Sequence, residues 1–455
     1  MPAPATETSS GRIAALKRTY GPQIERLRGS DTAKAAGLAL AMIANNVIAL
    51  GSTVVFARLL GDYGSLAALV SYFLILSVVG QAIQVATARE GVLGHLGVGP
   101  GLLATLRRWT RTMLIFTLAL TVVSILLRNP IAAAVGVKKY PWAAAIGLPA
   151  ACLWIELSIL RGALQGIGDY KSVGLSLVFE QATRLLTGAI LAAIGLGVTG
   201  AYLGTPLSFI AMCAYCAVQL RRHVELVSGV PVQPGVVHAA ALQLWTHVRR
   251  AWVPIVGLIV IAVLQNIDII AAKHRFSGVR DLASSYAATA VAAKVLIWVA
   301  IGAGFYLVPE VSRRRAAGEE TRPVLARALA IIFVCSIPCL LIFAVAAKPL
   351  LRIAFGANRT EASGSLLVLG VAFTVLACTY LAIQYMLALK RTWFLVVIGA
   401  VAVAEPVLLL HASRRPQDFA IVVLAVQAAG ALAAFTLALW RSGPPPERAV
   451  SPELA

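Results

Sequence analysis

The sequence predicts an all-α membrane protein that crosses the bilayer about twelve times, in two groups of six helices. Three observations support this prediction. Of the 455 residues, 59% are hydrophobic and only 13% are charged, whereas soluble domains carry about 25% charged residues. Apolar runs long enough to cross a bilayer recur along the chain, and a polar segment near its middle divides them into equal sets.

The apolar runs give the expected positions of the helices, since a membrane span needs about 20 largely apolar residues. The expected spans lie near 35–56, 64–87, 112–127, 142–160, 173–194, 200–220, 251–272, 285–308, 328–347, 364–388, 394–411 and 419–440. The third run is short, and its ends are the least well defined.

Polar segments at the ends and in the middle set the domain organisation. The expected order is a basic cytoplasmic segment (1–34), an N-lobe (35–220), a cytoplasmic linker (221–250), a C-lobe (251–440) and a cytoplasmic tail (441–455). The first segment precedes a full span without a small-residue cleavage site, so it is expected to be retained rather than removed as a signal peptide. Within the linker, residues 238–250 have the spacing of a short amphipathic helix at the membrane surface.

The net charge of +20 predicts an orientation rather than a nucleic-acid partner. No RNP, zinc-finger or helix-turn-helix pattern accompanies the charge. About 25 of the 39 Lys and Arg residues fall in segments that are cytoplasmic if the chain starts inside, for example Arg313–Arg315. This bias predicts that both termini are cytoplasmic, and we expect the cytoplasmic membrane of a bacterium.

Motifs for catalysis and cofactor binding are missing from the sequence. It contains no G-x-S-x-G, H-E-x-x-H or Walker A pattern, so we predict no enzyme activity and no cofactor. Cys213 and Cys216 form a C-x-x-C pair, but with no second pair and no nearby histidine they are interpreted as buried thiols rather than metal ligands.

Charged residues inside the spans mark the candidate functional positions, because burying a charge in a membrane is costly. They are Glu156, Glu180, Arg184, Asp268, Lys294 and Glu405. Glu180 and Arg184 share a helix face, and they are either a self-neutralising pair or part of a cavity that meets an anionic substrate. Asp268 either holds a cation or a proton, or pairs with Lys294 on the adjacent span.

Several stretches resemble one transporter family. They are A-R-L-L-G-D-Y-G-S-L-A-A-L (57–69), R-G-A-L-Q-G-I-G-D-Y-K-S (161–172), Q-N-I-D-I-I-A-A-K-H (265–274) and V-P-E-V-S-R (308–313). In order and spacing they are similar to the polysaccharide transporters, the Wzx-type O-antigen and exopolysaccharide flippases of the multidrug/oligosaccharidyl-lipid/polysaccharide (MOP) exporter superfamily. The first turn is shorter than is usual in that family, and Glu405 beside Pro406 is not a family feature.

The resemblance implies two six-helix lobes around a central cavity that opens alternately to either side. Such proteins flip a polyprenyl-diphosphate-linked oligosaccharide between leaflets. Membrane lipids, and also the machinery that polymerises the polysaccharide, are the expected partners. From their positions, Arg184 and Lys294 are the candidates to meet the diphosphate, and Arg58 and Arg89 are candidates to guide the headgroup at the two mouths. Asp268, Glu180, Glu405 and Glu156 are the candidate coupling-ion or buried-charge residues.

Three other functions remain open at the level of sequence. A cation-coupled multidrug exporter would use the buried carboxylates to exchange substrate for protons or sodium. A peptidoglycan-precursor flippase is disfavoured because such chains carry about two further spans. A scaffold of a polysaccharide assembly complex would need no aqueous cavity.

Overall fold

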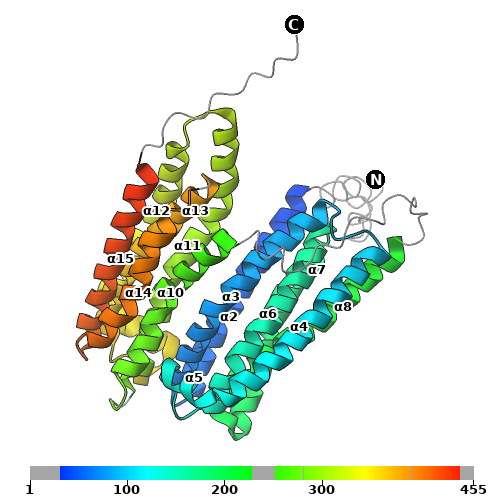
Figure 1. Ribbon diagram of the computed structural model, residues 1–455. Helices are drawn as coiled ribbons and strands as arrows, with labels where there is room; N and C mark the ends of the chain where they lie inside the picture. Colours follow the sequence, from blue (N-terminus) through cyan, green and yellow to red (C-terminus); the bar gives the residue numbers. More distant parts are fainter. Residues whose placement is uncertain (1–30, 228–251, 280, 390, 441–455) are drawn as a thin grey trace, which may run out of the picture.

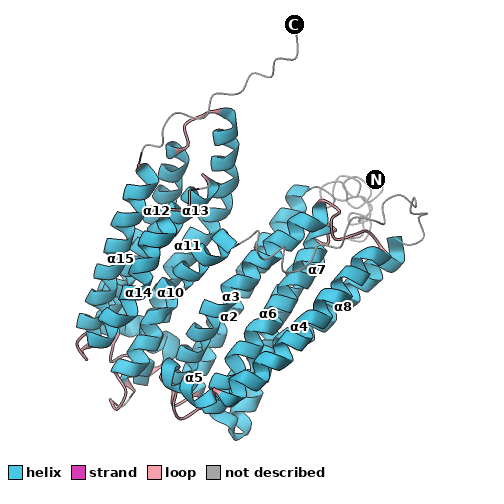
Figure 2. Cartoon of the chain, viewed as in Figure 1, coloured by secondary structure: helices cyan, strands magenta, loops and turns pink. Residues whose placement is uncertain are grey.

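The computed structural model describes residues 31–227, 252–279, 281–389 and 391–440, and every regular element in these ranges is a helix (Figure 2). The first set of helices is α2 (Asp31–Leu59), α3 (Tyr63–Val92), α4 (Pro100–Leu126), the short α5 (Arg128–Val135), α6 (Pro141–Gly166), α7 (Tyr170–Leu191) and α8 (Gly197–Val227). The second set is α10 (Trp252–Arg275), α11 (Leu282–Ala317), α12 (Arg322–Phe355), α13 (Leu366–Ala388), α14 (Phe394–His411) and α15 (Pro416–Leu439).

The number of crossings agrees with the prediction. Eleven helical stretches of the described chain are long and apolar enough to span a membrane, and one of them, Tyr170–Glu225, contains both α7 and α8. The chain reverses between these two helices at a π-helical turn, Ala192–Leu196, in which Gly195 has a φ of 105° and after which Gly197 has a φ of 52°. Such positive φ angles are accessible to glycine at little cost. The prediction of about twelve spans in an all-α, multi-pass membrane protein is therefore confirmed.

The two G-D-Y-x-S stretches of the sequence are helix starts. The side chain of Asp62 accepts a hydrogen bond from the backbone N–H of Ser65 at the start of α3. Asp169 accepts one from Ser172 in the same way at the start of α7. Each aspartate thereby satisfies one of the N–H groups that a helix leaves without an intrahelical partner.

The helices form two lobes, the N-lobe (α2–α8) and the C-lobe (α10–α15), which lie side by side in Figure 1. Within the N-lobe, α3 packs chiefly on α6, and within the C-lobe, α13 packs on α11 and α15. The lobes meet mainly where α3 contacts α10 and α11. The turn between α2 and α3 lies at one end of the bundle, which we call the α2–α3 end.

Three boundaries differ from the sequence-based expectation. The third spanning helix begins at Pro100 rather than near residue 112, because exposed arginines extend it beyond its apolar part. Residues 161–166, which follow the span expected at 142–160, are the last turns of α6. Helix α8 continues to Val227, past the expected end of the N-lobe. The expected amphipathic helix at 238–250 lies outside the described residues.

Candidate functional site

Two arginines share one buried glutamate in the N-lobe. Glu180 of α7 lies 2.7 Å from Nη2 of Arg184, one turn further along the same helix. Its second carboxylate oxygen lies 3.0 Å from Nη2 of Arg161 on α6. Arg161 also donates hydrogen bonds to the hydroxyl and the carbonyl oxygen of Ser176, at 2.8 and 2.9 Å. The carboxylate of Glu180 thus joins α6 to α7 through Arg161, and Arg161 extends the network to Ser176.

This N-lobe cluster (Arg161, Glu180, Arg184) carries one more positive than negative charge. Arg161 has no exposed surface, whereas the Arg184 side chain is 18% exposed. Nη1 of Arg161 and Nε of Arg184 are buried without a hydrogen-bond partner among the described residues. Since buried polar groups are normally paired, the excess charge and the unused donors together favour an anionic ligand at Arg184.

Aromatic rings surround the two guanidinium groups. The centre of the Arg184 guanidinium lies 5.3 Å from the ring centroid of Phe209, and that of Arg161 lies 5.6 Å from the ring of Trp154. Rings at this distance stabilise a cation without neutralising it. The cluster therefore remains positively charged while most of its surface is dry.

The C-lobe cluster (Asp268, Lys294, Glu405, Gln427) has the opposite balance. Lys294 of α11 lies 2.9 Å from Asp268 of α10, both side chains being buried. Glu405 of α14 accepts hydrogen bonds from the amide of Gln427 on α15, at 3.1 and 3.3 Å. Gln427 also donates to the carbonyl oxygen of Leu264, at 3.0 Å. The cluster thus holds two carboxyl groups but one ammonium group, which pairs with Asp268.

The charge of Glu405 lacks a cationic partner within hydrogen-bond distance among the described residues. A fully buried carboxylate that meets only an amide is costly unless a proton or a cation compensates its charge. Oδ2 of Asp268 is also buried without a hydrogen-bond partner in the described chain. The C-lobe cluster is therefore chemically suited to take up one proton or one monovalent cation.

The remaining predicted residues lie apart from both clusters. Glu156 of α6 is buried and accepts a hydrogen bond from the hydroxyl of Thr110, and its Oε2 has no described hydrogen-bond partner. Arg89 is exposed in the last turn of α3. Arg58, at the end of α2, donates hydrogen bonds to the carbonyl oxygens of Ile353 and Ala354 of the C-lobe. Arg58 and Arg89 thus lie at opposite ends of the bundle.

Sequence reasoning identified Arg184, Glu180, Asp268 and Lys294 but missed Arg161. It named Arg184 and Lys294 as the only cations within spans, and the structure adds Arg161 as a third, wholly buried one. The signal was available, because Arg161 follows a long apolar run and no glycine or proline separates it from that run.

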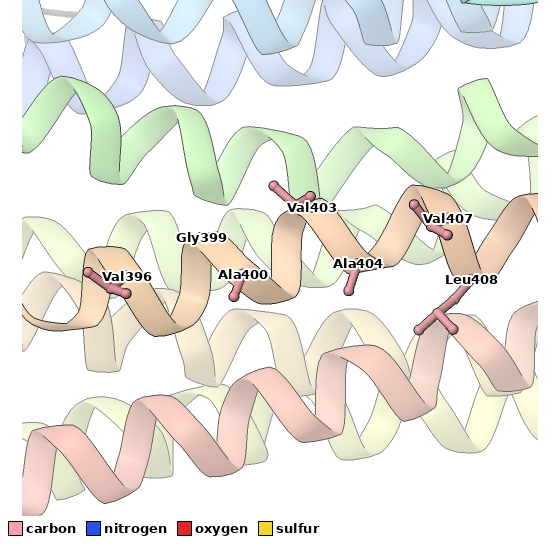
Figure 3. Close-up of a pocket in the computed structure, with 7 residues that line it drawn as sticks. All are labelled: Val396, Gly399, Ala400, Val403, Ala404, Val407 and Leu408. Carbon is pink, nitrogen blue, oxygen red and sulfur yellow. The ribbon is translucent and has the colours of Figure 1, made fainter.

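An apolar groove runs along α14, and its lining includes Val396, Gly399, Ala400 and Val403 (Figure 3). Its described lining includes no charged or hydroxyl side chain. The groove therefore cannot hold a diphosphate and is separate from both charged clusters.

Metal ligands are not grouped in the described part of the chain: no three His, Cys, Asp or Glu side chains are placed to hold a metal ion. Cys213 and Cys216 are free thiols there, and Cys216 is fully buried.

Structures of known proteins resemble this chain closely in fold. An inward-facing multidrug resistance MATE family transporter of the MOP superfamily aligns with a TM-score of 0.68 and 12% identity, over 89% of this chain and 97% of the other. The lipid II flippase MurJ, in an inward closed conformation, aligns with a TM-score of 0.63 and 14% identity, over 88% and 87%. An outward-facing MATE family transporter aligns less well, with a TM-score of 0.54 and 14% identity, over 90% and 96%. No family model matches the sequence, and no curated protein matches it.

These likenesses define the class of fold. The chain is a multi-pass, all-α membrane protein with the two-lobe fold of the MOP superfamily transporters. At 12–15% identity the likeness concerns the fold alone.

Proposed function

We propose that this protein is a transporter that flips lipid-linked oligosaccharide or polysaccharide repeat units across the bacterial cytoplasmic membrane by alternating access, with both termini inside. The observation that carries the proposal is the N-lobe cluster, a net positive charge with unused guanidinium donors deep in a membrane bundle. The fold shared with a lipid II flippase supports it, as do the sequence stretches similar to the Wzx-type flippases.

The chemistry of the substrate explains why such a cluster is useful. A polyprenyl-linked glycan has a tail that remains in the lipid, but its diphosphate cannot cross hydrocarbon without a partner that replaces its water. A guanidinium group suits this task because its planar fork donates two parallel hydrogen bonds to phosphate oxygens. In the proposal, Arg184 makes this contact, while Arg161 neutralises Glu180 and leaves the charge of Arg184 available.

The C-lobe cluster is proposed to couple transport to an ion gradient. Lys294 pairs with Asp268, and Glu405 meets only the amide of Gln427, so that gain or loss of a proton or monovalent cation changes the balance of charge in the C-lobe. This role uses no ATP, in keeping with the absence of a Walker A pattern from the sequence. Membrane lipids surround the bundle in this proposal, and the polymerase machinery takes over the flipped repeat unit.

A deletion strain tests the proposal directly. Without the gene, lipid-linked repeat units should accumulate on the cytoplasmic face of the membrane and surface glycan should be lost, and a plasmid copy should reverse both effects. The units are counted by chemical or enzymatic labelling of intact and of opened cells. Normal surface glycan without accumulation would refute the function.

A cation-coupled multidrug exporter is the second candidate, favoured by the negative balance of the C-lobe cluster and by the fold shared with MATE family transporters. Dye efflux from cells separates the two candidates. Efflux that is lost in Asp268→Asn, in a strain with normal surface glycan, would favour the exporter.

A further inference from the structure

Among the described residues, the hydrogen bonds between the two lobes are confined to one end of the bundle. They join the segments 57–64 and 134 of the N-lobe to the segments 273–284 and 353–359 of the C-lobe. These segments are the ends of α2, α5, α10 and α12 and the starts of α3 and α11, all of which lie at the α2–α3 end. The lobes are thus fastened at one face of the membrane.

Arg359 of the C-lobe binds the end of an N-lobe helix. This residue lies in a short 3-10 turn, Ala357–Arg359, directly after α12. Its guanidinium donates to the carbonyl oxygens of Ala57, Leu60 and Gly61, at 3.3, 2.7 and 3.0 Å. The last carbonyl groups of a helix have no intrahelical partner and carry the negative end of the helix dipole. Arg359 therefore caps α2 from the other lobe.

Arg58 makes the converse contact. It lies in the last turn of α2, the helix that Arg359 caps. Its guanidinium donates to the carbonyl oxygens of Ile353 and Ala354 in the last turn of α12, the helix that leads directly into Arg359. Arg359 thus caps the helix that carries Arg58, and Arg58 caps the helix that leads into Arg359; neither contact survives if the two helix ends separate.

We infer that Arg58 and Arg359 form a reciprocal clasp that holds the lobes together at the α2–α3 end and releases as a unit when the lobes part there. The clasp is the pair of arginines with the ends of α2 and α12. In the orientation proposed above, this end faces the outside, so the clasp is an outer gate. The better alignment with an inward-facing than with an outward-facing MATE transporter agrees with a closed outer end.

The surroundings of the clasp are arranged to hold it. Arg359 is buried, and Asp281 of its own lobe lies 3.3 Å from its Nη1 and orients it. Lys273 and Asp62 form a second bond between the lobes, with 2.7 Å between Nζ and Oδ1. The backbone N–H of Gly64 donates to the hydroxyl of Ser284, at 2.9 Å. A Cβ added at Gly64 would lie only 3.0 Å from the backbone nitrogen of Ser284, so glycine permits this close approach.

The free energy needed to release the clasp is small because of where its hydrogen bonds lie. The capped carbonyl groups and both guanidinium groups lie at helix ends, where water can replace each bond that is broken. The clasp therefore stabilises the state with a closed outer end, but by little enough that the state with an open outer end remains accessible.

Spin labels on the two lobes test the clasp. The labels are attached at Lys139→Cys and Arg414→Cys, two exposed residues at the α2–α3 end on opposite lobes, after the six native cysteines have been replaced by serine or alanine. In nanodiscs, the full chain should show mainly the short distance. The double variant Arg58→Gln/Arg359→Gln should raise the fraction with the long distance at least about fivefold, since several charge-assisted hydrogen bonds are lost.

Two controls accompany this experiment. Arg391→Gln removes an arginine that caps α15 within the C-lobe through the carbonyl oxygens of Leu437, Ala438 and Trp440, so it should leave the distances unchanged. Gly64→Leu should lengthen them by steric conflict with Ser284. A folded double variant with wild-type distances, or an equal shift in Arg391→Gln, would overturn the clasp. Because the readout needs no substrate, its failure leaves the proposed transport function standing.

The clasp should also be insensitive to pH across the physiological range. Burial alone would raise the pKa of Asp62, but hydrogen bonding and charge attraction from Lys273, with two hydrogen bonds from Ser65, outweigh burial and lower it. A lowered pKa means that the stability of the pair is present above the ordinary pKa of aspartate and is lost only below it. Tyr140, beside Asp62, stays neutral because burial and the Asp62 carboxylate raise its pKa. His274 donates through Nε2 to the carbonyl oxygen of Ala134 across the lobes, a bond that the protonated ring also makes. Arginine keeps its charge throughout.

The same label pair measures this insensitivity. The distance distribution should be equal at about pH 5 and about pH 8, apart from any change caused by the C-lobe cluster. To separate the two, the measurement is repeated in Glu405→Gln. A pH-dependent opening that persists in Glu405→Gln and disappears in Asp62→Asn would contradict the expectation.

Discussion

An Arg184→Gln variant should lose at least about tenfold of its transport rate while unfolding at nearly the wild-type temperature. The substitution removes the excess positive charge of the N-lobe cluster. It leaves Glu180 paired with Arg161 at 3.0 Å, so no buried carboxylate is stranded. The substitution is therefore expected to lower the transport rate without lowering the stability of the fold.

The rate is measured as surface glycan per copy of the protein in the complemented deletion strain. Arg184→Lys should fall between the wild type and Arg184→Gln, because an ammonium group keeps the charge but lacks the planar fork. The matched control is Arg108→Gln, which removes one exposed arginine from α4 and should transport normally. Wild-type transport by Arg184→Gln would exclude Arg184 from the path of the diphosphate.

A Lys294→Met variant should lose about 3–5 kcal/mol of stability, the typical cost of removing one partner from a buried ion pair. The substitution leaves Asp268, which has no exposed surface, without its cation. The double variant Asp268→Asn/Lys294→Met removes both charges and should recover most of the loss. Thermal unfolding of purified protein in detergent measures all three proteins.

The surface counterpart of this pair provides the control. Nζ of Lys273 lies 2.7 Å from Oδ1 of Asp62, a distance close to the 2.9 Å between Lys294 and Asp268. Both side chains of this pair, however, are partly exposed. Lys273→Met should therefore cost no more than about 1 kcal/mol. If Lys294→Met costs as little stability as Lys273→Met, then Asp268 and Lys294 do not form a buried ion pair in the C-lobe.

Hydropathy predicted the helices well and their ends poorly, for a physical reason. A spanning helix is apolar only where lipid surrounds it, while its hydrogen bonds continue into the interface. Helix α4 shows this: its apolar part begins near Met113, but the helix begins at Pro100 and carries Arg107, Arg108 and Arg111 on the way. The third span was therefore predicted too short.

Contacts of the candidate site were predicted where the two partners lie close together in the sequence, and they were missed where the partners lie far apart. Glu180 and Arg184 are four residues apart, so helical periodicity alone brings them together. The pairing of Asp268 with Lys294 was one of two alternatives and required the adjacency of two consecutive spans. Arg161 reaches Glu180 from another helix, and no local pattern reports such a contact. Arg359 was missed as well, because a single basic residue in a short turn has no periodicity to mark it.

The division into two lobes has a consequence for how the protein is made. Helix α3 packs on α10 and α11 across the lobes, and the buried residues form one continuous core. Most helix–helix packing nevertheless lies within a lobe, so the N-lobe can insert and begin to fold while the ribosome is still synthesising the C-lobe. Two separately translated chains, 1–227 and 252–455, should then reassemble in the membrane into a working protein. Evolution can likewise remodel one lobe while the other is inherited intact.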